Sequence, residues 1–565
     1  MIEKRIKLLR SKFKNFAIDG YVIPKNDEFF SEYASKDRLK TISNFTGSAG
    51  FAIILKKKNY LFVDGRYTLQ AEIESGRQFK IKKYEKIINC RLFKNLTLGI
   101  DPKIFTSDLL LKCFKKYNKI KVIEKNLIDT IYNNYSLKSK PFFSLNKNII
   151  GESHLTKIKK ISSFLKKNKK NFLFVSAPEN VAWLLNIRGF DNPNSPIPNC
   201  RLLINDKNKI YLISELAKLK KLIKERKIKK DQIIEPKKIG IFLDKFRNKK
   251  IIIDKKSCSI FYENLLKKKI QIYKSEDPIY FLKSIKNKQE IKNMINSHIS
   301  DGIALSKFLY WIQKVNKNKI TEYDAQNKLE SFRKKNKDYL FPSFNTIAGS
   351  GSNGAIIHYR ATKKTAKIIK NKDIFLCDSG GQYRYGTTDV TRTICFSKPN
   401  DNIKNIFTKV LKGHIAVASV DLSKYSDGKS IDVLARKYLK LEGLDYEHGT
   451  GHGVGFFLNV HEGPQAISKF NKIKICEGMI ISNEPGYYKK GKFGIRIENL
   501  VYVKKHKKKL MFENLTLAPI DKDLINSKKL SKKEKEYLFK YHLNVYLKIS
   551  KYLTKPEKKW LAGFI

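Results

Sequence analysis

The sequence predicts a multidomain protein of the α/β (α+β) class, on three observations. The chain has 565 residues, which is too long for one ordinary domain and long enough to bury several cores. Two successive stretches, the second closing near Ser275, alternate short apolar runs with amphipathic segments, as strands alternate with helices. From Asp277 a long amphipathic segment leads into glycine-rich loops and further apolar runs, which indicates a separate domain.

The first stretch predicts short strands joined by turns. Gly20–Pro24 is an apolar run that ends at a proline, and Phe51–Leu55 follows a turn-rich segment. Residues 60–63 form a third run, and the Asp64-Gly65 pair behind it is a turn signal. We assign residues 1–137 to domain I.

The second stretch predicts both helices and strands, and we assign it to domain II, residues 138–276. Its expected elements are, in chain order, a helix around 158–165, a strand at 171–175, a short helix at 181–187 and a hairpin of strands 202–205 and 210–213.

The third part opens with a predicted helix at 289–315, whose apolar residues recur at helical spacing. Strands and glycine-rich loops follow to residue 519, so the third domain is assigned to 277–519. Residues 520–565 predict two helices. No internal repeat is visible in the letters, although a diverged duplication stays open.

The formal net charge of +63 is extreme. A basic chain can bind nucleic acid or an anionic membrane. Here, however, the lysines are scattered along the whole length, and no zinc-finger spacing or RNA-binding signature accompanies them. We interpret the charge as compositional drift and expect no specific nucleic-acid partner.

The cysteines and the N-terminus predict a cytoplasmic protein. The seven cysteines are odd in number, widely spaced and without a CxxC pair, which favours reduced thiols over a disulfide framework. Residues 1–16 lack the apolar core of a signal peptide. No run of 18 apolar residues occurs, so we expect no membrane partner.

A group of metal-binding residue types gathers in the third domain. The chain has only nine histidines. Four of these and four carboxylates lie in or beside its glycine-rich segments: His358, His448, His452, His461, Asp378, Asp389, Glu484 and Glu498. Scarce ligand types in one region predict a metal site.

The two aspartates follow apolar runs. Asp378 ends the run 374–377, and Asp389 follows a second turn, so a hairpin can bring both carboxylates face to face. Two carboxylates at such a distance repel each other unless a cation lies between them. Either aspartate alone is more often a turn or helix-capping residue.

Residues 448–455 contain four glycines, which predicts a tight loop with positive φ angles that passes close to a ligand. His448 and His452 lie four residues apart in it, and the sequence alone leaves open which one binds metal. Residues 494–501 alternate with a period of two, so Arg496 and Glu498 share one face. A carboxylate for Arg496 and a cation for Glu498 would satisfy that face. Four carboxylates with imidazole suit two ions of Mn²⁺, Co²⁺ or Zn²⁺.

The sequence resembles the pita-bread metallopeptidases, and most closely the three-domain Xaa-Pro aminopeptidase (aminopeptidase P) group. The matching motifs run through most of the chain: NFTGSAG (44–50), VDGRY (63–67), VAWLLNIRG (181–189), NGAIIHY (353–359), DSG (378–380), GTTDVTRT (386–393), HGTGHGVG (448–455), NEPG (483–486) and GIRIEN (494–499). The resemblance implies two creatinase-like N-terminal α/β domains, a pita-bread catalytic domain and a homodimer.

The resemblance also implies roles. The five metal ligands are Asp378, Asp389, His452, Glu484 and Glu498, with Asp389 and Glu498 bridging two divalent ions, Mn²⁺ as first choice and Co²⁺ or Zn²⁺ as alternatives. The substrate-lining residues are His358, His448, His461 and Arg496. Glu484 handles the proton, and His358 and His461 hold the substrate and the oxyanion.

The implied reaction is hydrolysis of the N-terminal X-Pro bond of a peptide by a hydroxide that two metal ions activate. Two alternatives stay open: a prolidase that acts on X-Pro dipeptides, and a noncatalytic pita-bread protein that binds peptides or histones. One departure from the family pattern, Phe190 with Asn194 and Ser195 in a proline-rich loop, leaves the fine substrate preference open.

Overall fold

The computed structural model describes residues 2–87, 93–132, 140–507 and 509–565. The chain divides into two compact units, Met1–Tyr280 and Phe281–Ile565. The predicted border at 276/277 lies four residues from this division, whereas the predicted border at 137/138 and Cys90 lie outside the described residues. Within the described ranges, no helix combines the length and the apolar character that crossing a membrane requires.

The first unit begins with a six-stranded sheet in the order β4-β3-β2-β1-β5-β6. Its strands are β1 (Gly20–Pro24), β2 (Phe51–Leu55), β3 (Asn59–Val63), β4 (Lys80–Lys83), β5 (Thr97–Ile100) and β6 (Lys119–Val122). β1, β2 and β3 pair antiparallel, whereas β4, β5 and β6 are added in parallel. The predicted strands are confirmed, but the Asp64-Gly65 turn is a short 3-10 helix, Gly65–Tyr67, that Asp64 caps.

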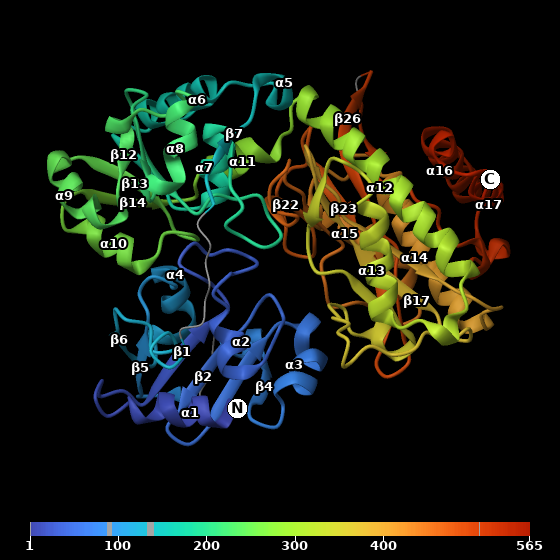
Figure 1. Cartoon of the computed structure of the whole chain (residues 1–565), viewed down its shortest axis with the longest axis horizontal. Helices are drawn as coiled ribbons and strands as arrows, with labels where there is room; N and C mark the ends of the chain where they lie inside the picture. Colours follow the sequence, from blue (N-terminus) through green and yellow to red (C-terminus); the bar gives the residue numbers. More distant parts are fainter. Residues whose placement is uncertain (1, 88–92, 133–139, 508) are drawn as a thin grey trace. The chain divides into compact units, whose positions relative to one another are not determined.

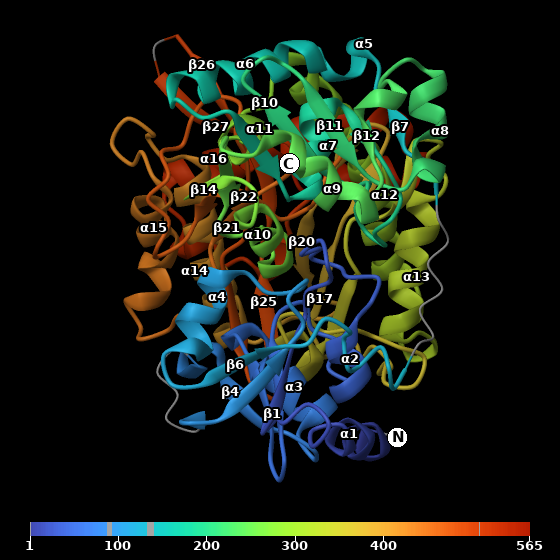
Figure 2. The same cartoon turned by 90° about the vertical axis from the view of Figure 1, so that its left-hand side faces the viewer.

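Helices cover both faces of this sheet. On one face lie α1 (Ile2–Ser11), α2 (Arg38–Ser43) and α3 (Thr68–Ser75), which pack on Tyr21 and Ile23. On the other face, Val22 packs with residues of α4 (Ser107–Leu110) and the turn behind it. Figure 2 shows the strands of this sheet with α1, α2, α3 and α4 labelled. Successive residues of β1 thus enter two different cores, as the period of a strand requires.

The second six-stranded sheet has the order β12-β11-β10-β8-β13-β14. Its strands are β8 (Phe172–Val175), β10 (Arg201–Asn205), β11 (Ile210–Ile213), β12 (Ile233–Ile234), β13 (Lys250–Asp254) and β14 (Gln271–Ser275). Position by position, this is the order of the first sheet, with the same parallel and antiparallel pairs. The first unit therefore contains a structural repeat that the letters of the sequence conceal.

The helices of this second half are α5 (Lys147–Ile150), α6 (His154–Lys167), α7 (Pro178–Leu185), α8 (Leu216–Lys224), α9 (Ile239–Leu243) and α10 (Ile260–Lys267). Helix α11 (Ile279–Ser284) contains the division between the two units. The helix predicted at 181–187 exists, but as α7 it begins three residues earlier and ends two residues earlier. It begins at Pro178 because the fixed φ of proline suits the first helical turn. It ends before Asn186, which takes the left-handed conformation, and Ile187 then joins the short strand β9 (Ile187–Arg188), which pairs with β7 (Phe143–Ser144).

The second unit combines short sheets with long helices. Its strands are β15 (Tyr339–Pro342), β16 (Ile347–Ser350), β17 (Phe375–Ser379), β18 (Gly381–Tyr383), β19 (Gly386–Thr387), β20 (Val390–Ile394), β21 (Gly451–Gly453), β22 (Glu462–Ile467), β23 (Ile480–Asn483), β24 (Gly486–Lys489), β25 (Phe493–Arg496), β26 (Asn499–His506) and β27 (Lys509–Asn514). The sheets have the orders β16-β17-β20, β15-β18-β19, β22-β21-β23-β26-β27 and β24-β25.

The helices of the second unit are α12 (Lys288–Lys314), α13 (Glu322–Arg333), α14 (Asp401–Ala418), α15 (Gly428–Lys440), α16 (Lys532–Ile549) and α17 (Lys555–Ala562). Figure 1 shows α12 beside α13. The predicted long helix is confirmed as α12, which Asn287 and Glu290 begin with a reciprocal cap. The expected pair of C-terminal helices is confirmed as α16 and α17, and the α/β (α+β) class holds for the whole chain.

Candidate active site

Two antiparallel strands bring the predicted aspartates to one place. Asp378 lies in β17, and Asp389 immediately precedes β20, with which β17 pairs. Asp389 is only 4 % exposed. Burial first, and the nearby Asp378 carboxylate among other groups, raises the pKa of Asp389. The hairpin expected from the sequence therefore places one acid beside the other in a buried region.

His452, the central residue of β21, faces two of the carboxylates. Its Nε2 lies 3.4 Å from Asp389 Oδ2 and 3.5 Å from Glu484 Oε1. Its Nδ1 lies 2.9 Å from the carbonyl oxygen of Gly453. A carbonyl only accepts, so Nδ1 carries the hydrogen, which leaves the lone pair of a neutral imidazole on Nε2. A metal-binding histidine has this arrangement.

The protonation of His452 reflects its neighbours. Burial alone would lower the pKa of this imidazole, but Asp389 and Glu484 outweigh burial and raise the pKa to about 9. The two carboxylates thus favour positive charge at the place that His452 Nε2 faces, and a divalent cation would supply such a charge.

Glu498 lies between β25 and β26 and is 1 % exposed. Its Oε2 accepts a hydrogen bond of 2.8 Å from Thr391 Oγ1. Burial first, and then the carboxylates of Asp389 and Glu484, raises its pKa well above the ordinary value. One ligand atom each of Asp389, His452 and Glu498 lies within 4.8 Å of the others, a spacing at which one ion can contact all three.

Arg496 lies against the acids. Its Nη2 donates to Asp378 Oδ2 over 2.6 Å, and its Nε donates to Thr391 Oγ1 over 3.0 Å. The prediction that Arg496 meets a carboxylate is therefore confirmed, and the carboxylate is one of the predicted metal ligands. The other oxygen of Asp378, Oδ1, is buried without a hydrogen-bond partner among the described residues. Buried carboxylate oxygens are rarely left unsatisfied, so these residues fit a cation.

The remaining histidines lie around this centre. Nε2 of His448 is 2.8 Å from Tyr488 Oη, and Tyr488 Oη accepts from Arg496 Nη1 over 2.6 Å. The ring of His461 is centred 4.2 Å from that of His452. His448 thus belongs to a chain that leads through Tyr488 to Arg496, whereas His452 is the histidine that meets the carboxylates.

His358 follows a short 3-10 helix, Gly351–Ala355, in a loop that Glu322 organises. The buried carboxylate of Glu322, at the start of α13, accepts hydrogen bonds from Asn353 Nδ2 (3.0 Å) and Tyr359 Oη (2.8 Å). It also accepts from two backbone amides, those of Ser350 and Lys367. The segment on either side of His358 is therefore held to one carboxylate.

The glycines of residues 448–455 act differently from the prediction. None of the four has a positive φ, and residues 451–453 are a strand rather than part of a loop. A Cβ atom on Gly451 would lie 1.9 Å from the carbonyl oxygen of Ser482, and one on Gly453 would lie 2.3 Å from Gln465 Nε2. These positions are glycine because β21 lies pressed against its neighbours, which brings His452 close to the acids.

Three residues of this centre were not among the sequence candidates. Ser482 Oγ accepts from the backbone N–H of His452 (2.9 Å) and donates to Glu484 Oε1 (3.1 Å). Thr391 bridges Arg496 and Glu498, and Tyr488 bridges His448 and Arg496. Hydroxyl residues are common in strands, so the sequence offered only one signal: Thr391 and Ser482 each lie two residues from a proposed ligand, Asp389 and Glu484 respectively.

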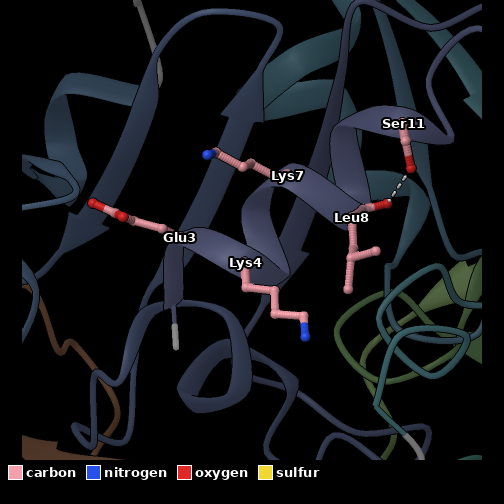
Figure 3. A pocket seen from close by; sticks show the side chains of 5 residues that line it. All are labelled: Glu3, Lys4, Lys7, Leu8 and Ser11. Carbon is pink, nitrogen blue, oxygen red and sulfur yellow. Dashed lines mark hydrogen bonds between the residues drawn. The ribbon is translucent and has the colours of Figure 1, made fainter.

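Other features of the described residues fit a metal or substrate less well. Cys395, Asp521 and Asp523 also lie close together. However, Asp521 already accepts from the backbone N–H groups of Cys395 and Asp523, and burial raises the pKa of the Cys395 thiol. Figure 3 shows a hollow on α1 in the first unit, where Ser11 Oγ donates to the carbonyl of Leu8 over 2.9 Å. It contains no histidine and one carboxylate, that of Glu3.

Four family profiles match the chain. Metallopeptidase family M24 matches residues 292–505. Creatinase/Prolidase N-terminal domains match residues 5–129 and 134–290, and the C-terminal region of peptidase M24 matches residues 508–563. The acid and histidine cluster lies inside the first of these matches.

Known proteins also match this chain over nearly its full length. A probable Xaa-Pro aminopeptidase P of Laccaria bicolor is 37 % identical over 99 % of this chain and 92 % of its own. Xaa-Pro aminopeptidase 1 of Dictyostelium discoideum is 37 % identical over 100 % of this chain and 96 % of its own.

Solved structures agree with these matches. An X-prolyl aminopeptidase of Caenorhabditis elegans, described as a cytosolic enzyme with a di-nuclear active site, has a TM-score of 0.92 at 28 % identity and covers 100 % of this chain and 99 % of its own. A prolidase of Pyrococcus furiosus has a TM-score of 0.51 at 25 % identity, with 63 % of this chain and 98 % of its own covered.

Proposed function

Because this chain belongs to metallopeptidase family M24, within the Xaa-Pro aminopeptidase group, we propose that it removes the N-terminal residue of peptides whose second residue is proline. It is a hydrolase with two creatinase-type N-terminal domains and a pita-bread catalytic domain. The match to Xaa-Pro aminopeptidases spans nearly all of both chains, so the activity concerns the whole protein rather than one module. The observation that carries the proposal is the cluster of the buried Asp389 and Glu498 with the half-buried His452.

Five residues would hold two divalent ions: Asp378, Asp389, His452, Glu484 and Glu498. Three features support this set: the Oδ1 of Asp378 without a hydrogen-bond partner among the described residues, the raised pKa of Glu498, and the position of His452 Nε2 close to both Asp389 and Glu484. Asp389 and Glu498 are proposed to bridge the ions, with Mn²⁺ as first choice. When bound, the ions lower the pKa of a water molecule and polarise the scissile carbonyl.

The side chains around the acids supply the rest of the chemistry. The nitrogen of an X-Pro bond carries no hydrogen and must gain a proton to leave. Glu484, which is half-buried and held by Ser482, is proposed to carry that proton to the proline nitrogen. His358 and His461 are proposed to hold the substrate backbone and to stabilise negative charge on the carbonyl oxygen.

His448 and Arg496 are proposed to line the substrate site from the other side. Tyr488 ties the two together through bonds of 2.8 Å and 2.6 Å. The guanidinium also bonds Asp378, so its position is fixed before any substrate arrives. Rigid placement of this kind reduces the entropy that substrate binding costs.

A prolidase that cleaves only X-Pro dipeptides is the second candidate. The Pyrococcus furiosus prolidase matches 63 % of this chain, whereas the aminopeptidases match its full length, which favours the aminopeptidase. A noncatalytic peptide-binding protein is disfavoured because every proposed ligand position carries a ligand-type residue.

We also propose a cytoplasmic homodimer that acts on peptides and has no specific nucleic-acid or membrane partner, with domains at 1–137, 138–276, 277–519 and a helical extension at 520–565. The Caenorhabditis elegans enzyme is described as cytosolic, which supports the location. Light scattering of the purified chain tests the dimer.

Metal analysis combined with peptide cleavage tests the function. We expect two divalent ions per chain and cleavage of X-Pro-Y tripeptides. Cleavage of X-Pro dipeptides alone would identify a prolidase, and a chain that binds no divalent ion would reject the whole proposal.

A further inference from the structure

Helix α16, near the C-terminus, places one polar group, the hydroxyl of Tyr541, in the core of the second unit. Its residues Leu538, Tyr541, Val545 and Ile549 recur on one face and pack into the same core as Ile495 and Ile497, which flank Arg496. Figure 1 shows α16, coloured red, beside α17, the last helix before the C-terminus. Apolar contacts explain three of these side chains, but the hydroxyl of the buried Tyr541 requires a polar partner.

That partner is Arg392, in the middle of β20. Arg392 is 1 % exposed, and no carboxylate oxygen of the described residues lies within 4.0 Å of its guanidinium. Its Nη2 donates instead to three neutral oxygens, each 2.8 Å away: Asn499 Oδ1, the carbonyl of Ala518 and Tyr541 Oη. A buried guanidinium whose hydrogen bonds all go to neutral oxygens depends on these dipoles, so each acceptor contributes to its position.

The hydroxyl of Tyr541 is both an acceptor and a donor in this arrangement. Its oxygen accepts from Arg392, and its hydrogen is available to the carbonyl of Ala518, 2.8 Å away. Ala518 therefore accepts from both groups, which closes a ring of three hydrogen bonds. Removal of the hydroxyl would break two of the three bonds and leave Nη2 with Asn499 Oδ1 and the Ala518 carbonyl, so the guanidinium would lose the acceptor that α16 supplies.

The opposite edge of the same guanidinium reaches a proposed metal ligand. Arg392 Nη1 donates to the backbone carbonyl of Glu498 over 2.6 Å and to that of Thr391 over 2.8 Å. Thr391 holds the Glu498 carboxylate through its hydroxyl and the Glu498 backbone N–H through its carbonyl. The backbone of Glu498 is thus fixed by Arg392 and Thr391 together, and Tyr541 fixes Arg392.

We propose that Tyr541 is a positioning residue through which the C-terminal helical extension sets the geometry of Glu498 and hence the affinity of the catalytic unit for its metal ions. The proposal rests on the proposed function only in taking Glu498 as a metal ligand. It gives residues 520–565 a role in the reaction rather than in folding alone.

The direct test is Tyr541→Phe in the full-length chain, which keeps the packed ring and removes the hydroxyl. Titration of the metal-free protein with Mn²⁺ should show affinity lower by about 3- to 10-fold, below the roughly 10- to 100-fold typical of groups that touch a ligand directly. Turnover at limiting Mn²⁺ should fall, KM should change little, and saturating Mn²⁺ should restore much of the rate. Tyr546→Phe, on the same helix, is the matched control, because no hydrogen bond of its phenol occurs among the described residues.

A double-mutant cycle tests the route through Arg392. Arg392→Lys keeps the charge and removes the fork, so the effect of Tyr541→Phe on Mn²⁺ affinity should largely vanish in that background. If Tyr541→Phe does not accumulate as folded protein, Arg392→Lys alone should show the weakened Mn²⁺ binding. Additive effects, or unchanged Mn²⁺ affinity in Tyr541→Phe with only a lower melting temperature, would overturn the proposal. A wild-type chain that binds Mn²⁺ but cleaves no X-Pro peptide would overturn the proposed function instead.

Discussion

Arg496 donates from Nη2 to Asp378 Oδ2 over 2.6 Å, so one oxygen of this carboxylate is held by a cation of the protein and the other is left for a ligand. The pair also explains how four carboxylates can lie close together in a largely buried site despite their mutual repulsion. Arg496 offsets part of the negative charge and orients Asp378 at the same time.

Arg496→Lys is predicted to weaken both functions of this residue. Lysine keeps the charge near Asp378 but lacks the planar fork that also bonds Thr391 and Tyr488. We expect kcat/KM for an X-Pro-Y peptide to fall by about 10- to 100-fold, with a smaller loss of bound metal. Wild-type kcat/KM in this variant would show that the fork does not position the site.

Loss of either proposed bridging acid is predicted to abolish activity. Asp389→Ala and Glu498→Ala should each lower the metal content, because each carboxylate is proposed to contact both ions. Glu513→Ala, which removes an exposed acid of β27 in the same unit, should leave metal content and turnover intact. Two metals per chain with full turnover in either of the first two variants would reject the site.

Alanine variants of the three histidines are predicted to differ in the amount of metal that they bind. His452→Ala should lose metal, whereas His448→Ala should keep it, because Nε2 of His448 bonds Tyr488. His461→Ala should keep metal yet cost about 2–4 kcal/mol in transition-state stabilisation, mainly in kcat. Metal lost from His448→Ala and retained by His452→Ala would reverse the assignment.

The C-terminal extension is predicted to lose stability in acid through His542. Burial lowers the pKa of His542 to about 4, and its Nε2 accepts from the backbone N–H of Ile520 over 3.1 Å. Below the unfolded pKa of about 6.5, the unfolded chain binds a proton that the folded chain refuses, so stability falls as the pH falls from about 6.5 to about 4.

His542→Gln isolates this contribution, because the amide oxygen can accept the same bond without titrating. Between pH 7 and pH 5, the wild type should lose about 2 kcal/mol more stability than the variant, as 1.4 kcal/mol per pKa unit predicts. Denaturant unfolding at the two pH values measures the difference. Parallel losses in both proteins would assign the acid sensitivity to other groups.

The basic surface is predicted to be irrelevant to the reaction. If the net charge of +63 reflects composition, excess duplex DNA at physiological salt should leave peptide cleavage unchanged. Sequence-dependent DNA binding with a steep salt dependence would instead reveal a second function.

Local pattern was enough to predict the segments that carry the proposed ligands. The apolar run before Asp378 appears in the structure as β17. The alternation predicted over 494–501 is divided between β25 and β26, with a break at residues 497–498, so that part of the prediction is only half right. His448 and His452 could not be separated by spacing alone, because both lie on one short segment. Their hydrogen-bond partners, Tyr488 and Gly453, distinguish them.

Long-range contacts could not be predicted in this way. Gly451 is fixed by its approach to Ser482, and Arg392 by Tyr541, partners that are 31 and 149 residues distant in the chain. Strand order is similarly invisible in the letters, which is why the repeated sheet escaped detection. Such contacts depend on how the whole chain packs, which local sequence patterns do not reveal.

Two sheets connected in one order, one after the other along the chain, are what the duplication of an ancestral segment leaves behind. Selection then acts on each copy separately, because each has its own hydrophobic core. Apolar side chains substitute for one another freely as long as volume and pattern persist, so the letters diverge while the pairing order endures. A common origin of the two halves is therefore easier to recognise from the shared pairing order, which begins with β1–β2 in one half and β8–β10 in the other, than from the residues themselves.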